Sequence, residues 1–153
     1  MQTLNQFSQT SDRGQIALRG EGNNLISAVV DATEAGTVKA GDLLVLVGSK
    51  GDLPSVKKAT GAGGEVPLGF AVYNLVQNTW KAGELLELAL TSVCMKMEAS
   101  GAIPAKSSVA YNTATDLVEV APEVESASKP EVGLALTSAG AEHDLIVVYI
   151  QTL

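Results

Sequence analysis

The 153-residue sequence contains a single histidine, His143, and a single cysteine, Cys94. Histidine is the side chain that most often transfers protons in catalysis, and zinc sites use several His and Cys ligands. His143 follows the turn residues Gly140 and Ala141, so we interpret it as a solvated turn residue. The acidic residues are scattered and show no calcium-loop spacing. We therefore expect no catalytic residue, no metal and no cofactor, and predict that the protein is not an enzyme.

Positive charge and long apolar runs are also scarce. Lys and Arg number 10 against 17 Asp and Glu, which gives a net charge of −7. Because nucleic-acid binding depends on Lys and Arg neutralising phosphates, this balance argues against a nucleic-acid partner. No apolar run approaches the roughly 20 residues that span a bilayer, so we expect no membrane partner. The polar N-terminal stretch also lacks the apolar segment of a secretory signal.

Aromatic residues make up only 4% of the sequence, whereas hydrophobic residues make up 46% and 15 residues are Gly. The core must therefore consist of Val, Leu, Ile and Ala. Short apolar runs recur about every ten residues between Gly- or Pro-containing turns, which is typical of a β-barrel or sandwich. Helix signals are weak, so we expect little helix. The predicted strands span 25–31, 42–47, 55–59, 68–73, 84–90, 93–99, 108–111, 117–121, 132–137 and 144–151.

The order of these runs repeats once along the chain. A small-residue turn, two strands, an apolar-Gly-apolar-Ala strand and a final apolar strand occur in both halves, with Gly69 and Gly133 at equivalent places. Glycine inside a strand usually marks a bulge or a close backbone approach. We predict an all-β fold, a small barrel or sandwich built from two similar β-units. An extended arm, 1–24, would precede a single β domain, 25–153, with pseudo-repeat halves at about 25–92 and 93–153.

The predicted arm is polar and carries four scattered apolar residues, Leu4, Phe7, Ile16 and Leu18. We consider them candidate anchors for a partner, because an extended arm can add a strand to a neighbour's sheet edge. A frayed terminus is the alternative. Trp80 is the only tryptophan and has polar neighbours, which favours a loop. It is a possible interface residue, but a position that covers the edge of its own core is the favoured interpretation.

Two motifs suggest chemistry but have simpler explanations. Met95-Lys96-Met97 followed by Glu98 is similar to the attachment motif of biotin carrier domains, which hold the lysine at a hairpin tip. The turns that frame such a lysine are missing, so a plain strand with both methionines on one face is favoured. The glycine-rich stretch 61–64 lacks the Lys and Ser/Thr of a phosphate-binding loop and is interpreted as a flexible loop.

Three stretches of the sequence share a recurring pattern of turns and strands. Residues 37–42 form a Gly-Asp turn before a Leu/Val strand, and residues 66–72 form a Val-Pro-Leu-Gly-Phe-Ala-Val strand. Residues 98–105 contain the turn Ala-Ser-Gly-Ala-Ile, which leads to the Val-Gly-Leu-Ala strand within 131–136. This pattern resembles that of the capsid decoration, or cement, proteins of tailed bacteriophages. The sequence departs from the family pattern at residues 105–107, where Ala-Lys-Ser replaces an Ala-Gly-Asp type of turn.

This resemblance implies a structural role on the virion, at the outer surface of the capsid. It implies a homotrimer at three-fold and quasi-three-fold positions that clamps neighbouring copies of the major capsid protein and stabilises the head. Two other functions stay open: a biotinyl-type carrier domain modified at Lys96, and an oligomeric virion binding module such as a tail or receptor-binding component. Modification of Lys96 would identify the first, and cosedimentation with capsids would separate the decoration protein from the second.

Overall fold

The computed structural model describes residues 12–18 and 24–153, which form strands and turns but no helix, so none of these residues belongs to a helix that could span a membrane. The predicted all-β fold is confirmed, and each of the predicted strands is present within a few residues of its expected bounds. The strands are β1 (Ile16–Leu18), β2 (Leu25–Val30), β3 (Val38–Lys39), β4 (Leu43–Lys50), β5 (Leu53–Lys58), β6 (Pro67–Ala71), β7 (Thr79–Trp80), β8 (Leu85–Ala89), β9 (Cys94–Glu98), β10 (Ser108–Asn112), β11 (Leu117–Val120), β12 (Glu131–Ala135) and β13 (Leu145–Ile150).

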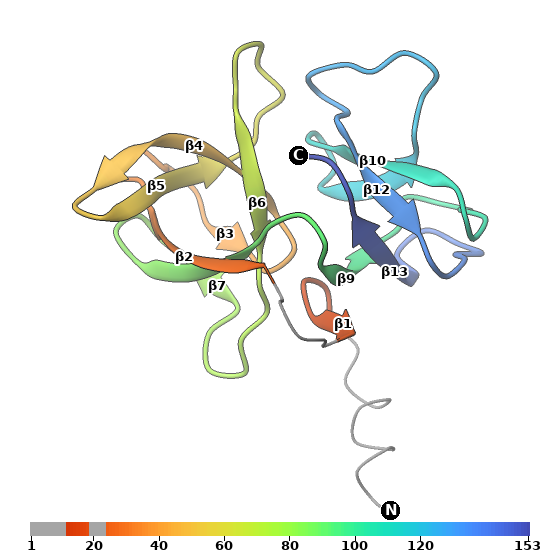
Figure 1. Ribbon diagram of the computed structural model, residues 1–153, viewed down its shortest axis with the longest axis horizontal. Coiled ribbons are helices and arrows are strands. Elements are labelled where there is room, and N and C mark those ends of the chain that lie inside the picture. The colour runs from red at the N-terminus through yellow and green to blue at the C-terminus, as the bar shows by residue number, and fades with distance from the viewer. Residues whose placement is uncertain (1–11, 19–23) are drawn as a thin grey trace, which may run out of the picture.

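The first unit is a closed barrel, on the left of Figure 1. Its strands follow the order β2-β5-β4-β6-β8, with β8 paired back to β2. The parallel pair of β2 and β5 completes the closure, which leaves no open edge in the barrel. The short strands β3 and β7 pair with each other beside the barrel. Both have only two residues, which is too short for an alternating pattern to show in the sequence.

The second unit, on the right of Figure 1, is a curled sheet with the order β1-β9-β13-β12-β10-β11. Each pairing of the first unit has a counterpart here: β9 takes the place of β2, β10 of β4, β11 of β5, β12 of β6 and β13 of β8. A single parallel bridge between Ala99 and Val118 corresponds to the β2–β5 pair, and a bridge between Ile103 and Ala139 corresponds to the β3–β7 pair. The second unit is therefore a more open version of the first.

The correspondence extends to single hydrogen bonds. The Val30 amide donates to the Glu84 carbonyl at 2.9 Å, and the Ala99 amide donates to the Asp144 carbonyl at the same distance. The prediction of two similar β-units is confirmed by this agreement. Further matched donor–acceptor pairs are Gly41 to Ala71 with Lys106 to Ala135, Leu46 to Val66 with Tyr111 to Pro130, and Asp31 to Val56 with Ser100 to Val118.

Gly69 and Gly133 occupy equivalent positions in β6 and β12, and both lie where two backbones approach closely. A Cβ atom at Gly69 would lie 2.6 Å from the Ala89 carbonyl oxygen, and one at Gly133 would lie 2.0 Å from the Tyr149 carbonyl oxygen. Both strands also border an irregularity in register with their neighbour. The close backbone approach predicted from these glycines is confirmed.

Two hydrophobic clusters fill the molecule. One fills the first barrel and includes Val30, Leu44 and Leu88. The larger one fills the second unit and continues onto the outer side of the first barrel, where Leu43 and Phe70 belong to it. The second cluster therefore joins the two units, and the ring of Phe70 meets the ring of Tyr111 edge to face with centroids 5.7 Å apart.

Candidate interaction surface

Residues 12–18, which we call the strap, connect the two units. The Gly14 amide donates to the Lys96 carbonyl at 2.8 Å, and the Lys96 amide donates to the Gln15 carbonyl at 2.8 Å. On the other side, the Tyr73 amide donates to the Gly14 carbonyl at 2.9 Å. The strap is thus an extra strand, β1, on the edge of β9 and also contacts the first unit, and Figure 1 shows β1 at the lower junction between the two units.

A polar network lies where the strap meets both units. Arg13 Nη2 is 2.8 Å from Oδ1 of Asp42, whose side chain is 0% exposed, and 3.3 Å from the Tyr111 hydroxyl. The second carboxylate oxygen of Asp42 accepts the Lys39 amide at 2.8 Å. The Tyr111 hydroxyl donates to Asp116 Oδ1 at 3.2 Å. One buried carboxylate is therefore compensated by the strap and by its own turn, and the network reaches the second unit.

Burial raises the pKa of Asp42, while the hydrogen bond from the Lys39 amide and the nearby Arg13 charge act in the opposite direction. Burial also raises the pKa of the Tyr111 hydroxyl, and the neighbouring Asp42 charge adds to that effect. A buried charge costs free energy unless it is paired. The arrangement therefore makes the position of Arg13, and with it the strap, important for the stability of the turn at Asp42.

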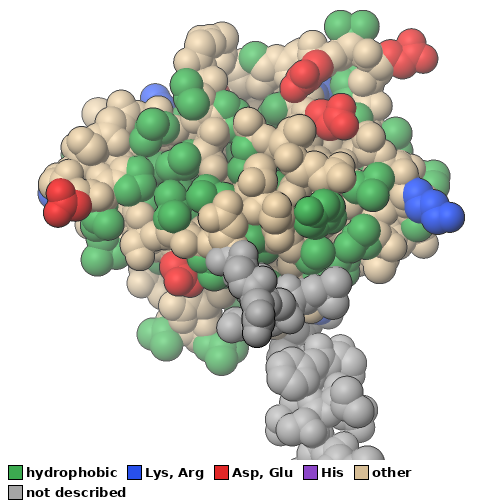
Figure 2. Space-filling view, viewed as in Figure 1, with side chains coloured by type: hydrophobic (Ala, Val, Ile, Leu, Met, Phe, Trp, Pro, Cys, Tyr) green, Lys and Arg blue, Asp and Glu red, His purple; other side chains and the backbone are tan. Residues whose placement is uncertain are grey.

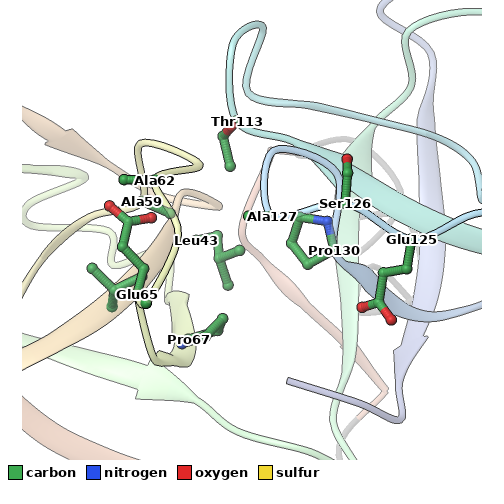
Figure 3. Close-up of a pocket in the computed structure, with 12 residues that line it drawn as sticks. Leu43, Ala59, Ala62, Glu65, Pro67, Thr113, Glu125, Ser126, Ala127 and Pro130 are labelled. Carbon is green, nitrogen blue, oxygen red and sulfur yellow. The ribbon is translucent and has the colours of Figure 1, made fainter.

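A cleft of about 370 Å³ separates the two units on the side away from the strap. Figure 3 shows Leu43, Glu65 and Pro67 of the first unit facing Ser126 and Pro130 of the second. The glycine-rich stretch 61–64 borders this cleft as a loop, as predicted. A Cβ at Gly61 would lie 2.6 Å from Thr113 Oγ1, so the glycine allows this loop to pack against the second unit.

The loop between β6 and β7 carries the two most exposed hydrophobic side chains among the described residues. Leu75 is 87% exposed and Val76 is 94% exposed. The loop is nevertheless ordered by its own polar groups, because Asn74 Oδ1 accepts the Val76 amide at 2.8 Å and Gln77 Nε2 donates to the Thr79 carbonyl at 3.0 Å. Figure 2 shows hydrophobic side chains at the lower edge of the molecule, where this loop projects in Figure 1. We call Leu75 and Val76 the apolar tip.

The candidate anchors of the predicted arm have different positions. Ile16 is partly buried against the larger cluster of its own chain, and Leu18 lies in β1 opposite Cys94. Leu4 and Phe7 lie outside the described residues. Ile16 is therefore engaged within this chain. Whether the arm also contacts a partner stays a prediction.

Trp80 does not lie in a loop, because it belongs to β7 and pairs with Val38. Its side chain is 3% exposed and is part of the cluster inside the first barrel. The expectation of a loop was wrong because the two-residue strand has no periodic pattern. Little of the indole ring is left on the surface for a partner.

Lys96 lies in the middle of β9, between β1 and β13, and pairs with Val147. Met95 and Met97 are buried on one face of the strand, as the plain-strand interpretation predicts. A biotin carrier presents its lysine at a hairpin tip, and Lys96 does not have that position. His143 Nδ1 lies 2.5 Å from Glu98 Oε1 on the surface, and within residues 12–18 and 24–153 no three His, Cys, Asp or Glu side chains converge as a metal site would require.

Arg13, Asp42 and the apolar tip were not predicted from the sequence. Asp42 could have been recognised as a candidate, since it is the charged residue directly before the apolar run 43–47. Its partner is 29 positions away in the chain, and no local pattern links the two. The apolar pair at 75–76 stands between polar residues, a context that marks a loop but not its function.

No family model matches the sequence, and no curated protein matches it. Among solved structures, the fold is similar to the head fiber gp8.5 N base of bacteriophage phi29, with a TM-score of 0.55 and 16% sequence identity. The likeness covers 83% of this chain and 94% of that chain. At this identity the comparison shows that the two proteins share a fold across most of their lengths.

Proposed function

We propose that this chain is a non-enzymatic structural protein of a tailed-phage virion, located at the head. The observation that carries the proposal is the fold shared with a phage head fiber base over 83% of this chain. In its finer form, the proposal is a decoration protein that binds the outer capsid surface as a homotrimer at three-fold and quasi-three-fold sites. There it clamps neighbouring copies of the major capsid protein and stabilises the head.

The apolar tip supports contact with another protein. Two adjacent hydrophobic side chains that are almost fully exposed contribute nothing to the core of their own chain. Hydrophobic groups that gather on the surface of a soluble protein commonly mark an interaction site. The hydrogen bonds of Asn74 and Gln77 hold the loop in shape before binding, which lowers the entropy lost on association. We propose that the tip contacts the capsid.

Cosedimentation with purified capsids that lack this protein tests the proposal. Wild-type protein should pellet with the capsids, and the double variant Leu75→Asp, Val76→Asp should bind roughly 100-fold more weakly, because two hydrophobic side chains are replaced by charges that must be desolvated. Val124→Asp is the matched control, since Val124 is 80% exposed in a different loop. Failure of the wild type to pellet with any capsid would refute the proposed location.

The same experiment, repeated with whole virions, distinguishes the decoration protein from a tail or receptor-binding component. A tail or receptor-binding component would bind virions but not tail-less capsids. The carrier function has little support, because Lys96 lies within a three-strand pairing and not at a hairpin tip. Mass spectrometry of protein made with an active biotin ligase should therefore show an unmodified Lys96.

A further inference from the structure

The contact between the two units joins two different kinds of surface. The first unit contributes an outward apolar face formed by Phe70 of β6, Ala89 of β8 and Val72, which directly follows β6; all three are buried. The second unit contributes an edge that includes Tyr111 and Pro130, which are held together by a 3.0 Å hydrogen bond from the Tyr111 amide to the Pro130 carbonyl. Phe70 contacts Tyr111 directly. We call these two surfaces the face and the edge; the edge is a surface patch and not an unpaired strand.

Each unit has both surfaces, because the two units have the same topology. The pair Phe70 and Ala89 of the first unit corresponds to the pair Leu134 and Tyr149 of the second, and both pairs lie directly opposite each other across neighbouring strands. Leu136 corresponds in the same way to Val72. In the second unit this face stays hydrophobic, although residues 12–18 and 24–153 form no third unit that covers it. Leu134 and Tyr149 are partly exposed, and Leu136 is 42% exposed.

The edge also has a counterpart, in the first unit. The Leu46 amide donates to the Val66 carbonyl at 2.9 Å, as the Tyr111 amide does to the Pro130 carbonyl. Leu46 is 43% exposed and Val66 is 58% exposed. The described residues therefore leave uncovered one hydrophobic face on the second unit and one hydrophobic edge on the first unit. These are the two surfaces that meet inside the chain.

We propose that these two surfaces bind each other between copies of the chain, so that the edge of one copy covers the face of the next. The intrachain contact is the physical argument, because it shows that a face and an edge of this fold are complementary. A contact of this head-to-tail type leaves the same two surfaces free at the ends of any open assembly, and only a closed ring covers all of them. A ring of three copies rests on the proposed function, whereas the contact itself does not.

Sedimentation velocity of the full chain tests the contact. Leu136→Asp alters the face, Val66→Asp alters the edge, and Val124→Asp is the control at an exposed position outside both surfaces. Wild type and control should self-associate, and each of the other two variants alone should do so roughly 100-fold more weakly. A mixture of the two should form dimers, because the intact face of Val66→Asp can still bind the intact edge of Leu136→Asp.

A covalent version of the experiment does not depend on those variants folding. In a Cys94→Ser background, Leu46→Cys combined with Leu134→Cys should give intermolecular disulfides on oxidation, since these positions correspond to Tyr111 and Phe70. A monomeric wild type, a Leu136→Asp variant that associates normally, a mixture that forms no dimers, or oxidation that yields only monomers would each overturn the contact. Capsid cosedimentation tests the proposed function independently of the contact. Self-association without capsid binding would refute only the proposed function. Capsid binding by a monomeric protein would refute only the contact.

Discussion

The two units of this chain have corresponding strand pairings, but only the first closes into a barrel. The first unit joins β2 to β5 and forms a complete barrel, whereas the second has only the Ala99–Val118 bridge at that position and is joined by the strap at the edge of β9. A duplicated fold can therefore cover the edge of its sheet with its own strands or with a segment from elsewhere in the chain. The second solution ties the stability of the second unit to residues that precede the first.

The strap also restricts which residue the first unit can have where the two touch. Its turn at Gly41 has a φ of +86° and lies so close to the strap that a Cβ atom there would be 2.6 Å from Arg13 Cγ. The equivalent turn of the second unit carries Lys106 at a φ of +71°, and no strap crosses it. The same backbone conformation thus requires glycine in one unit and accepts a long side chain in the other.

The largest expected loss of stability comes from substitution of the equivalent glycines of β12 and β6. Gly133→Ala should cost about 3 kcal/mol, because the new Cβ would meet the backbone carbonyl of Tyr149 at 2.0 Å, and Gly69→Ala should cost about 1 to 2 kcal/mol for its looser 2.6 Å approach. Urea unfolding at constant m measures both. Gly101→Ala is the control, since a Cβ at Gly101 meets nothing within 4 Å. A greater loss at Gly69 than at Gly133 would show that β6 and β12 are not packed as described.

The second effect concerns the strap, which adds a strand to the sheet of the second unit only. Arg13→Ala leaves the buried Asp42 carboxylate with the Lys39 amide as its partner, and should cost about 2 kcal/mol. It should also speed hydrogen exchange at the Tyr73 and Lys96 amides, whose acceptors lie in the strap.

The control for this variant is Lys129→Ala, which breaks the more exposed pair between Lys129 Nζ and Glu119 Oε1 and should cost less than about 1 kcal/mol. The double variant Arg13→Ala, Asp42→Asn should recover part of the lost stability, because it removes the unpaired charge. Equal losses for Arg13→Ala and Lys129→Ala would mean that the strap contributes no more than a surface ion pair.

The sequence was sufficient to predict the strands that both units share. Apolar runs next to turn residues identify strands such as β4 and β13, since at least part of each strand is buried. The repeat was visible through Gly69 and Gly133, because close backbone contact imposes glycine locally. These features depend on short-range pattern, and they are the part of the fold that could be predicted.

The candidate surfaces could not be predicted from local sequence patterns, because they depend on contacts between distant parts of the chain. Leu136 and Val72 have the same sequence context, yet one is exposed and the other is buried, because only the first unit is covered by a neighbour. The pairing of Arg13 with Asp42 likewise depends on how the strap crosses the first unit. Aligning the two halves could have shown which positions correspond, but not which of them the chain leaves uncovered.

The smallest expected change in stability comes from giving the turn of the second unit the glycine that the first unit has in its equivalent turn. Lys106→Gly should stabilise the protein by about 0.5 kcal/mol, because relief of the positive φ slightly exceeds the entropy that glycine adds to the unfolded chain. Lys106→Ala is the control that removes the same amine and keeps the backbone strain. Thermal unfolding should therefore rank Lys106→Gly above Lys106→Ala. The reverse order would mean that the second unit has adapted its turn to lysine, and that the glycine of the first unit reflects the strap alone.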